Sequence, residues 1–358
     1  MIKSVYLHIP FCKKKCNYCS FCSFELLKYK DEYVDSLVKE IKHFYKKEKL
    51  DTIYFGGGTP SLLEINDIKR ILDNFNYDQK TEITLEINPD IEFEKLKEFK
   101  NLGINRISIG VQSFDDKILK KIGRSHNSAQ AIKTIENVKK LYKNFSIDLM
   151  YGLPSQTLKN WIETLDIAIS FNIPHISLYG LKIEQGSKFY KNLPKIPTLD
   201  MQAKMQKKAF EILDKNYKHY EFSNFAISDK YCSRHNINYW KCQNYYGFGL
   251  SASGYINNSR YTNTFNFKEY LNNPITKDFE TLTKQNQIEE EIFLGLRLLE
   301  GIDFNLINKK YNIDIYNIYR ETFDKFLDFK ILEKTQNGVK LTEDAILVSN
   351  EILCEFLV

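Results

Sequence analysis

A regular alternation of short β-rich runs with amphipathic helical stretches constrains the fold of this chain more than any other feature. Strands are predicted at 4–9, 52–55, 81–88, 106–112, 146–151 and 175–181, with helices between them, for example at 31–47, 127–142 and 157–172. Six strands joined by crossover helices indicate a parallel α/β fold. Because six units are two short of a closed eight-stranded barrel, we predict a partial, open (β/α)6 barrel of the TIM type.

The predicted strand at 81–88 has one apolar and one polar face. Ile83, Leu85 and Ile87 share the apolar face, and Glu86 lies on the polar one. Residues 106–112 alternate in the same way. Because successive side chains of a strand point to opposite sides, the apolar set should meet the outer helices and the polar set the barrel lumen. The sequence therefore predicts a lumen that holds a polar ligand.

The second half of the chain has a different pattern. A helical connection is expected at 190–216, whereas 217–265 is rich in aromatic residues, Asn and Gly and has little periodicity. Helical patterns return at residue 288, and a β-hairpin is predicted around Asn337 and Gly338. We therefore divide the chain into a barrel at 1–190, a connecting region at 191–280 and a smaller helical, winged-helix-like domain with a β-hairpin at 281–358.

Charge and hydropathy exclude some classes of protein. The net charge is only +5, and the lysines are interleaved with acidic residues, so we expect solvated helix faces and no nucleic-acid partner. No apolar run approaches the roughly 18 residues that a membrane-spanning helix needs, and the N-terminus has no signal-peptide pattern. We expect a cytoplasmic protein; peripheral contact with the inner face of the membrane is the alternative.

Four of the seven cysteines fall within residues 12–22, directly after the first predicted strand. Cys12, Cys16 and Cys19 have the spacing Cys-x3-Cys-x2-Cys, and Tyr18 precedes the third. In a cytoplasmic chain such clustering indicates metal rather than disulfides. Thiolates suit iron–sulfur clusters, and three of them on one tight loop can hold three corners of a cubane while the fourth iron stays open. A zinc site with Cys22 as fourth ligand is the alternative.

The string YLHIPFCKKKCNYCSF at 6–21 resembles the cluster loop of the radical S-adenosylmethionine (SAM) superfamily. Within that superfamily it is similar to the family of oxygen-independent coproporphyrinogen III oxidases and HemW haem chaperones. The resemblance implies a [4Fe–4S] cluster on Cys12, Cys16 and Cys19, with SAM on the open iron. An electron from the reduced cluster can then break a carbon–sulfur bond of SAM.

The resemblance also implies a set of residues that bind the cofactors. FGGGTP at 55–60 matches the superfamily's glycine-rich element near the SAM amino group, and LEINPD at 85–90 carries the family's SAM-contacting glutamate. Several members of the set lie at the carboxyl ends of predicted strands, where barrel active sites assemble. For each, a purely structural role is the alternative. The full set is Tyr6, Tyr18, Gly57, Gly58, Thr59, Glu86, Gln112, Arg124, Asp148 and Gly180.

Two features separate the oxidases from the chaperones. The oxidases carry a fourth cysteine two positions after the third and a long N-terminal extension, but here position 21 is Phe and the first predicted strand starts at residue 4. The string HNINYW at 235–240 resembles the HNxxYW motif associated with haem binding in the HemW group. His235 is therefore a candidate iron ligand, and the neighbouring aromatic rings could cover a porphyrin face. Alternatively, the motif only pins a loop over the barrel mouth, which the 191–280 region is expected to complete.

These observations favour an iron–sulfur- and SAM-binding haem chaperone that delivers haem to acceptor haemoproteins, membrane-associated ones among them. A reductant such as flavodoxin or ferredoxin is expected as a partner if SAM is cleaved. The first alternative is an enzyme, the oxygen-independent coproporphyrinogen III oxidase. This enzyme would decarboxylate the propionate side chains of its substrate oxidatively. A less favoured alternative is radical SAM haem degradation.

Overall fold

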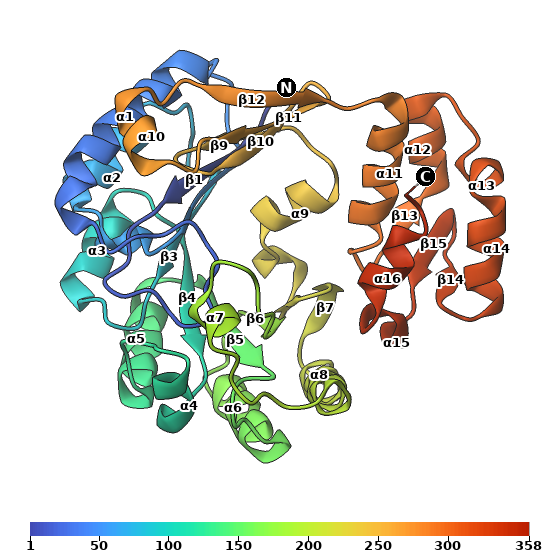
Figure 1. Cartoon of the computed structure of the whole chain (residues 1–358), viewed down its shortest axis with the longest axis horizontal. Coiled ribbons are helices and arrows are strands. Elements are labelled where there is room, and N and C mark those ends of the chain that lie inside the picture. The colour runs from blue at the N-terminus through green and yellow to red at the C-terminus, as the bar shows by residue number, and fades with distance from the viewer. Residues whose placement is uncertain (358) are drawn as a thin grey trace.

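The computed structural model describes residues 1–357, and its main feature is a 12-stranded sheet with the order β12-β11-β10-β9-β1-β2-β3-β4-β5-β6-β8-β7. Strands β1 to β6 are parallel and form a curved, open barrel wall (Figure 1). The predicted six parallel strands are confirmed, and no predicted end differs from the observed end by more than two residues. Their bounds are β1 (Ser4–Ile9), β2 (Thr52–Gly57), β3 (Glu82–Ile87), β4 (Arg106–Gln112), β5 (Asn144–Tyr151) and β6 (His175–Gly180).

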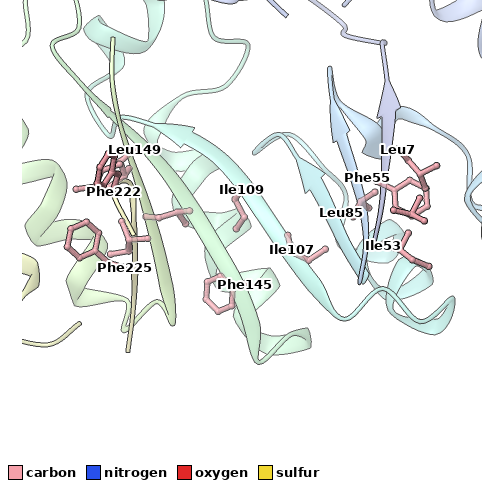
Figure 2. Packing of buried hydrophobic residues seen from close by; sticks show 14 of the residues in the cluster. Leu7, Ile53, Phe55, Leu85, Ile107, Ile109, Phe145, Leu149, Phe222 and Phe225 are labelled. Carbon is pink, nitrogen blue, oxygen red and sulfur yellow. The ribbon is translucent and has the colours of Figure 1, made fainter. Parts of the chain in front are cut away.

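Helices cover the outer, convex face of these strands (Figure 1). The apolar strand faces pack against them, and Figure 2 shows part of this core, in which Leu7, Phe55 and Ile107 are fully buried. The prediction that the apolar face of the 81–88 strand is buried is confirmed, because Ile83, Leu85 and Ile87 all belong to the core. The covering helices are α1 (Lys30–Phe44), α2 (Ile65–Leu72), α3 (Phe93–Asn101), α4 (Asp116–Lys121), α5 (Ser128–Leu141), α6 (Leu158–Ser170) and α8 (Leu199–Leu213).

Residues 217–281 contain six strands that were not predicted from the sequence. Two of them extend the sheet antiparallel beyond β6, and four extend it on the other side, where β9 pairs parallel with β1. Strand β9 has the sequence YYGF with at least three buried residues, so burial on both faces hides the alternation that marks a half-buried strand. The strands are β7 (Lys218–Glu221), β8 (Asn224–Ala226), β9 (Tyr245–Phe248), β10 (Ser253–Ile256), β11 (Ser259–Asn263) and β12 (Lys277–Thr281).

The HNINYW string lies in a helix, α9 (Arg234–Trp240), on the concave side of the sheet (Figure 1). We expected this segment at the barrel mouth, but it contacts the amino-terminal ends of β2 and β3. Glu82 accepts hydrogen bonds from the backbone N–H groups of Arg234 (3.5 Å) and His235 (3.3 Å). A carboxylate at the first turn of a helix satisfies unpaired N–H groups and complements the helix dipole, which explains why α9 begins there.

The C-terminal part of the chain packs helices against a small sheet of order β13-β15-β14. The predicted hairpin is confirmed, because Leu332 pairs with Leu341 and Lys334 with Val339. No helix within residues 1–357 is long and apolar enough to cross a membrane. The elements of this part are α11 (Lys284–Gly295), β13 (Ile302–Asp303), α12 (Phe304–Tyr311), α13 (Ile315–Ile318), α14 (Arg320–Asp328), β14 (Leu332–Lys334), β15 (Gly338–Leu341), α15 (Glu343–Ile346) and α16 (Ser349–Cys354). The remaining helical elements are α7 (Lys188–Lys191), α10 (Phe267–Asn272) and 3-10 turns at Leu27–Tyr29, Pro60–Leu62 and Asp229–Tyr231.

A buried ion pair ties the additional strands to the outer helices. The Lys277 ammonium in β12 lies 2.5 Å from the Glu40 carboxylate in α1, and the two side chains are only 1% and 0% exposed. Glu40 also accepts hydrogen bonds from the backbone N–H of Gly249 and from the Asn263 and Tyr270 side chains. These partners offset the cost of burying the charge, so the strands β9 to β12 depend on them for their position.

Lys277→Met should lower the free energy of unfolding by about 3 kcal/mol, because methionine fills the space of lysine but leaves the buried Glu40 without its counter-ion. Urea denaturation measures the loss. Lys49→Met is the matched control, since the Lys49–Asp78 pair is exposed (61% and 39%) and should contribute less than about 1 kcal/mol. If both variants lose the same free energy of unfolding, the buried pair stabilises the fold no more than an exposed pair does.

Candidate functional site

The cysteine-rich loop follows the carboxyl end of β1 and is closed at its neck by backbone hydrogen bonds. Cys12 N donates to Phe24 O (2.9 Å), and Phe24 N donates to Pro10 O (2.7 Å). Inside the loop, Cys19 N donates to Cys16 O (3.3 Å), which forms a tight turn between the last two candidate ligands. Cys12, Cys16 and Cys19 are all partly exposed, so the three thiols border a space that is open to a ligand.

The end of β2 holds this loop through direct backbone contact. Gly58 N donates to Ile9 O (2.8 Å), and Thr59 N donates to Phe11 O (2.7 Å). A Cβ atom at Gly58 would lie 2.6 Å from Phe11 O, so only glycine allows the two segments to approach this closely. The glycine triplet therefore positions the cysteine loop, and the N–H groups of Gly57 and Gly58 are already used by the Glu86 carboxylate and Ile9 O.

A chain of polar contacts joins two of the candidate cysteines to the ends of three strands. Thr59 Oγ1 donates to Cys12 Sγ (3.8 Å), and Asn88 Nδ2 donates to Thr59 Oγ1 (2.9 Å). Arg124 then donates to Asn88 Oδ1 (2.7 Å) and to Cys16 Sγ (3.4 Å). The guanidinium therefore places a positive charge beside the Cys16 sulfur, where a metal-ligating thiolate would carry a negative one. The sequence did not mark Asn88 as a site residue; its place just after β3, in line with the polar face of that strand, was the available signal.

Arg124 also brings a second predicted residue into the site. Its guanidinium donates to Gly110 O in β4, and the side chain of Gln112 lies next to the same glycine. Gln112 follows a bulge in β4 and has φ +68°, a left-handed conformation that is uncommon for residues other than glycine. Tyr18 packs against a small apolar cluster beside this region.

Burial favours the neutral form of two of the three thiols, Cys12 and Cys19. Burial raises the pKa of the Cys12 thiol, although hydrogen bonds with Ser23 and Thr59 offset part of this effect. Burial also raises the pKa of Cys19. Ligands must be deprotonated before they bind metal, so loading this site releases protons and is favoured by higher pH.

Two half-buried acids, Glu86 and Asp148, lie on β3 and β5. Burial raises the pKa of Glu86 to about 7, and hydrogen bonds from Tyr54 (2.8 Å) and from the N–H of Gly57 limit the shift. Burial likewise raises the pKa of Asp148 to about 6, against hydrogen bonds from Ser177 and Ser108. The two carboxyl groups can therefore change their protonation near neutral pH when a ligand arrives.

Tyr6 and Gly180 have structural contacts that fix the walls of the lumen. The Tyr6 hydroxyl is hydrogen-bonded to His8 Nδ1 (3.1 Å), and His8 Nε2 is hydrogen-bonded to Cys22 O (2.8 Å). Gly57 has φ +108°, and a Cβ there would meet the His8 ring at 2.7 Å. At the end of β6, a Cβ on Gly180 would lie 3.0 Å from the Tyr151 ring. His8 was missed from the sequence because nothing local indicates its contact with residue 22.

His235 is separated from these residues and lies at the amino-terminal end of the barrel. Its Nδ1 is hydrogen-bonded to Thr52 Oγ1 (2.7 Å) and its Nε2 to the Tyr239 hydroxyl (2.7 Å). The ring stacks on Tyr54, and burial lowers its pKa to about 3, so the imidazole is neutral. Both ring nitrogens are occupied, and a haem iron could bind either one only after a hydrogen bond breaks. These contacts favour the alternative interpretation of the HNINYW motif, in which the motif holds its own segment in place.

The cysteine loop fits a cubane cluster in its chemistry. Within residues 1–357, no three His, Cys, Asp or Glu side chains converge as the ligands of one metal ion would. A [4Fe–4S] cluster takes each thiolate on a different iron, so its ligands surround a volume and need not converge on a point. Three partly exposed thiols on one loop, with Arg124 to balance their charge, meet this requirement.

Comparison with known proteins finds two matching family profiles, similar chains and a structure with the same fold. The profile of the radical SAM superfamily matches residues 6–168, and that of the HemN C-terminal domain matches residues 282–348. The chain is 36% identical to the heme chaperone HemW of Lactococcus lactis over 99% of this chain and 97% of the relative. It is 34% identical to HemW of Bacillus subtilis over 99% of both chains. The solved structure of the coproporphyrinogen III oxidase HemN from Escherichia coli has the same fold, with a TM-score of 0.88, 21% identity, and coverage of 100% of this chain and 90% of that chain.

Replacing Cys12, Cys16 or Cys19 with alanine should abolish cluster binding, because a site with three thiolates has no spare ligand. Cys22→Ala is the matched control and should keep most of the iron, since the Cys22 thiol is hydrogen-bonded to Ser251, outside the Cys12–Arg124–Cys16 contacts. Iron and sulfide content after anaerobic reconstitution measures the effect. If the Cys22 variant loses as much iron as the other three, the ligand assignment is wrong.

Proposed function

The chain belongs to the HemW family of radical SAM proteins, and on this premise we propose that it is an iron–sulfur- and SAM-binding haem chaperone. The observation that carries the proposal is similarity along almost the whole chain to relatives that are named heme chaperones. The acceptors that we propose are haemoproteins, including membrane-associated ones, and a flavodoxin or ferredoxin would serve as reductant if SAM is cleaved.

In this proposal, Cys12, Cys16 and Cys19 would hold a [4Fe–4S] cluster, and the chemistry supplied there would be reductive cleavage of a carbon–sulfur bond of SAM. Arg124 donates to Cys16 Sγ and keeps a positive charge beside the thiolates. Thr59 holds Cys12 from the other side and is itself held by Asn88. These contacts support a rigid three-ligand loop.

The SAM site that we propose lies between the glycine triplet and the lumen acids. Glu86 and Asp148 would accept hydrogen bonds from SAM, and Gly57 and Gly58 would lie beside it. The remaining proposed cofactor contacts are Tyr6, Tyr18, Thr59, Gln112, Arg124 and Gly180. Support comes from position for three of them, since Thr59, Gln112 and Gly180 lie at or just beyond the carboxyl ends of β2, β4 and β6.

The affinity for SAM should rise with pH between about 6 and 8, because the ionised Glu86 carboxylate is the stronger hydrogen-bond acceptor and its pKa is about 7 in the ligand-free protein. Below this pKa the carboxyl is mostly protonated and the contact is weaker. Equilibrium binding to the reconstituted protein measures the effect. Glu86→Gln should bind SAM about tenfold more weakly or worse at pH 8 and lose most of the dependence on pH. If the SAM affinity of this variant depends on pH as that of the wild type does, Glu86 has only a structural role.

A haem titration combined with an oxidase assay on one sample separates the two leading functions. A chaperone should bind haem stoichiometrically and should not convert coproporphyrinogen III, even with a reduced cluster and excess SAM. Absorption spectroscopy follows the haem, and chromatography of the porphyrins follows conversion. Robust decarboxylation would overturn the chaperone proposal in favour of the oxidase, whose fold this chain shares.

A further inference from the structure

A concentration of lysines surrounds the cysteine loop, although the stretches that carry these lysines are far apart in the sequence. The stretches are 12–22, 117–122 and 182–191, and together they contain nine lysines and one acid. The whole chain has a net charge of only +5, so the rest of the chain is slightly negative. The nine residues, which we call the lysine face, are Lys13, Lys14, Lys15, Lys117, Lys120, Lys121, Lys182, Lys188 and Lys191.

Asn17, which lies between two of the candidate cluster ligands, joins the three stretches. Its backbone N–H donates to Ile122 O (2.9 Å), and its Nδ2 donates to Lys121 O (2.9 Å). From the third stretch, Phe189 N donates to Asn17 O (2.9 Å). The lysine face is therefore one continuous surface in the folded chain, and it borders the cysteine loop.

An apolar cluster beneath the lysine face holds the stretches in place. It draws side chains from all three: Tyr18, Ile118, Leu119, Ile122, Leu181, Ile183 and Phe189. Because each stretch packs its apolar side chains into this cluster, its lysines are left on the outside. Eight of the nine are exposed, and Lys15 is half-buried.

Few acids compensate the charge of the lysine face. Within residues 1–357, Lys13 alone of the nine has an ion pair, with Asp90 at 2.9 Å. The one acid in the stretches, Glu184, accepts a hydrogen bond from Ser20 Oγ (2.5 Å). Asp115, just before the lysines of α4, caps the first turn of that helix. Like charges without counter-charges repel one another and destabilise the compact state, so folding gains nothing from this arrangement.

Two exposed aromatic rings lie among the lysines. Phe21 is 62% exposed and follows Ser20, whose hydroxyl is hydrogen-bonded to the third stretch. Tyr190 is 57% exposed and follows Phe189, whose N–H is hydrogen-bonded to Asn17. Aromatic residues are enriched at the centres of protein interfaces, and charges around them steer the partner and fix its orientation. The surface thus has both components of a site for another protein.

We propose that the lysine face docks the reductant, an acidic protein that carries a single electron on a cofactor near its own surface. The inference rests on the cluster of the proposed function, and it adds the surface and the charge of the partner. The electron passes from the carrier, which is oxidised, to the group held by the cysteine loop, which is reduced, and no bond forms or breaks. Because 13–15 lies between Cys12 and Cys16, the docked carrier would meet the chain at the edge of that group.

The kind of cation favours an acidic electron carrier over a nucleic acid. All the cations of the three stretches are lysine, and none is arginine. Arginine is preferred where phosphate groups are held tightly by paired hydrogen bonds, whereas lysine is a strongly hydrated point charge. Complexes for electron transfer are small and weak, and steering by charge raises the rate at which they form. A surface of lysines alone suits this kind of encounter.

The test is the binding of an acidic flavodoxin to the full-length, cluster-loaded protein. Calorimetry measures the affinity with the flavodoxin oxidised, so that no electron passes. The wild type should bind, and its affinity should fall as the salt concentration rises. Lys120→Glu combined with Lys188→Glu should weaken binding about tenfold or more, because each reversal turns attraction into repulsion. The matched control, Lys309→Glu combined with Lys334→Glu, makes the same change of charge at exposed lysines of the C-terminal part and should bind as the wild type does.

A second measurement separates docking from damage to the cluster. Reduced flavodoxin should bleach the cluster absorption more slowly in the Lys120 and Lys188 double variant. Iron content, melting temperature and photoreduction by deazaflavin, which needs no docking, should match the wild type.

Three results would overturn this inference and leave the proposed function standing. They are no flavodoxin binding by the wild type at low salt, equal flavodoxin affinity in the two double variants, and loss of binding to a DNA duplex but not to flavodoxin in the Lys120 and Lys188 variant. The haem titration tests the proposed function separately. Salt-dependent docking at these lysines by a protein that binds no haem would support this inference and refute the haem-chaperone proposal.

Discussion

Direct backbone contact between the end of β2 and the start of the cysteine loop is the constraint on which the candidate site depends. Two hydrogen bonds, from Gly58 N to Ile9 O and from Thr59 N to Phe11 O, place the loop against the barrel. The contact exists only because position 58 has no side chain; a Cβ there would lie 2.6 Å from Phe11 O. Once the backbones meet, Thr59 reaches Cys12, and Asn88 and Arg124 extend the contact to Cys16. The loop is thereby fixed by the ends of several parallel strands, whereas β1 alone would leave its tip unsupported.

The same parallel arrangement sets the electrostatics of the lumen. Alternate side chains of β3 and β5 point inward, which places Glu86 and Asp148 in a buried space shared with Arg106 and Arg124. Burial favours the neutral acids and the nearby arginines favour the charged ones, so the pKa values settle near 7 and 6. A lumen balanced in this way can take up or give off a proton as a ligand binds, at little cost in free energy.

Helix α9 differs in its surroundings from one end to the other. Its amino end is held on the barrel by Glu82 and by the contact of His235 with Thr52, so that end is part of the scaffold. Its carboxyl end presents Tyr239 and Trp240 to an open cavity and ends in the left-handed Cys242. The rigid end therefore positions the exposed one, and the polar motif that first suggests a ligand is mostly used to hold the helix.

The sequence by itself determined the six parallel strands, the facing of their side chains and the loop of three cysteines, because these follow from local periodicity and local spacing. Family resemblance supplied the candidate residues, but their contacts came only from the tertiary structure. Arg124 meets Asn88 and Cys16 across 36 and 108 residues, and His235 meets Thr52 across 183. The strands between 217 and 281 were not predicted because each has only three to five residues, and β9, with three of its four residues buried, lacks the alternation of apolar and polar residues. Periodicity tells which face of an element is buried, but only folding decides what that face is buried against.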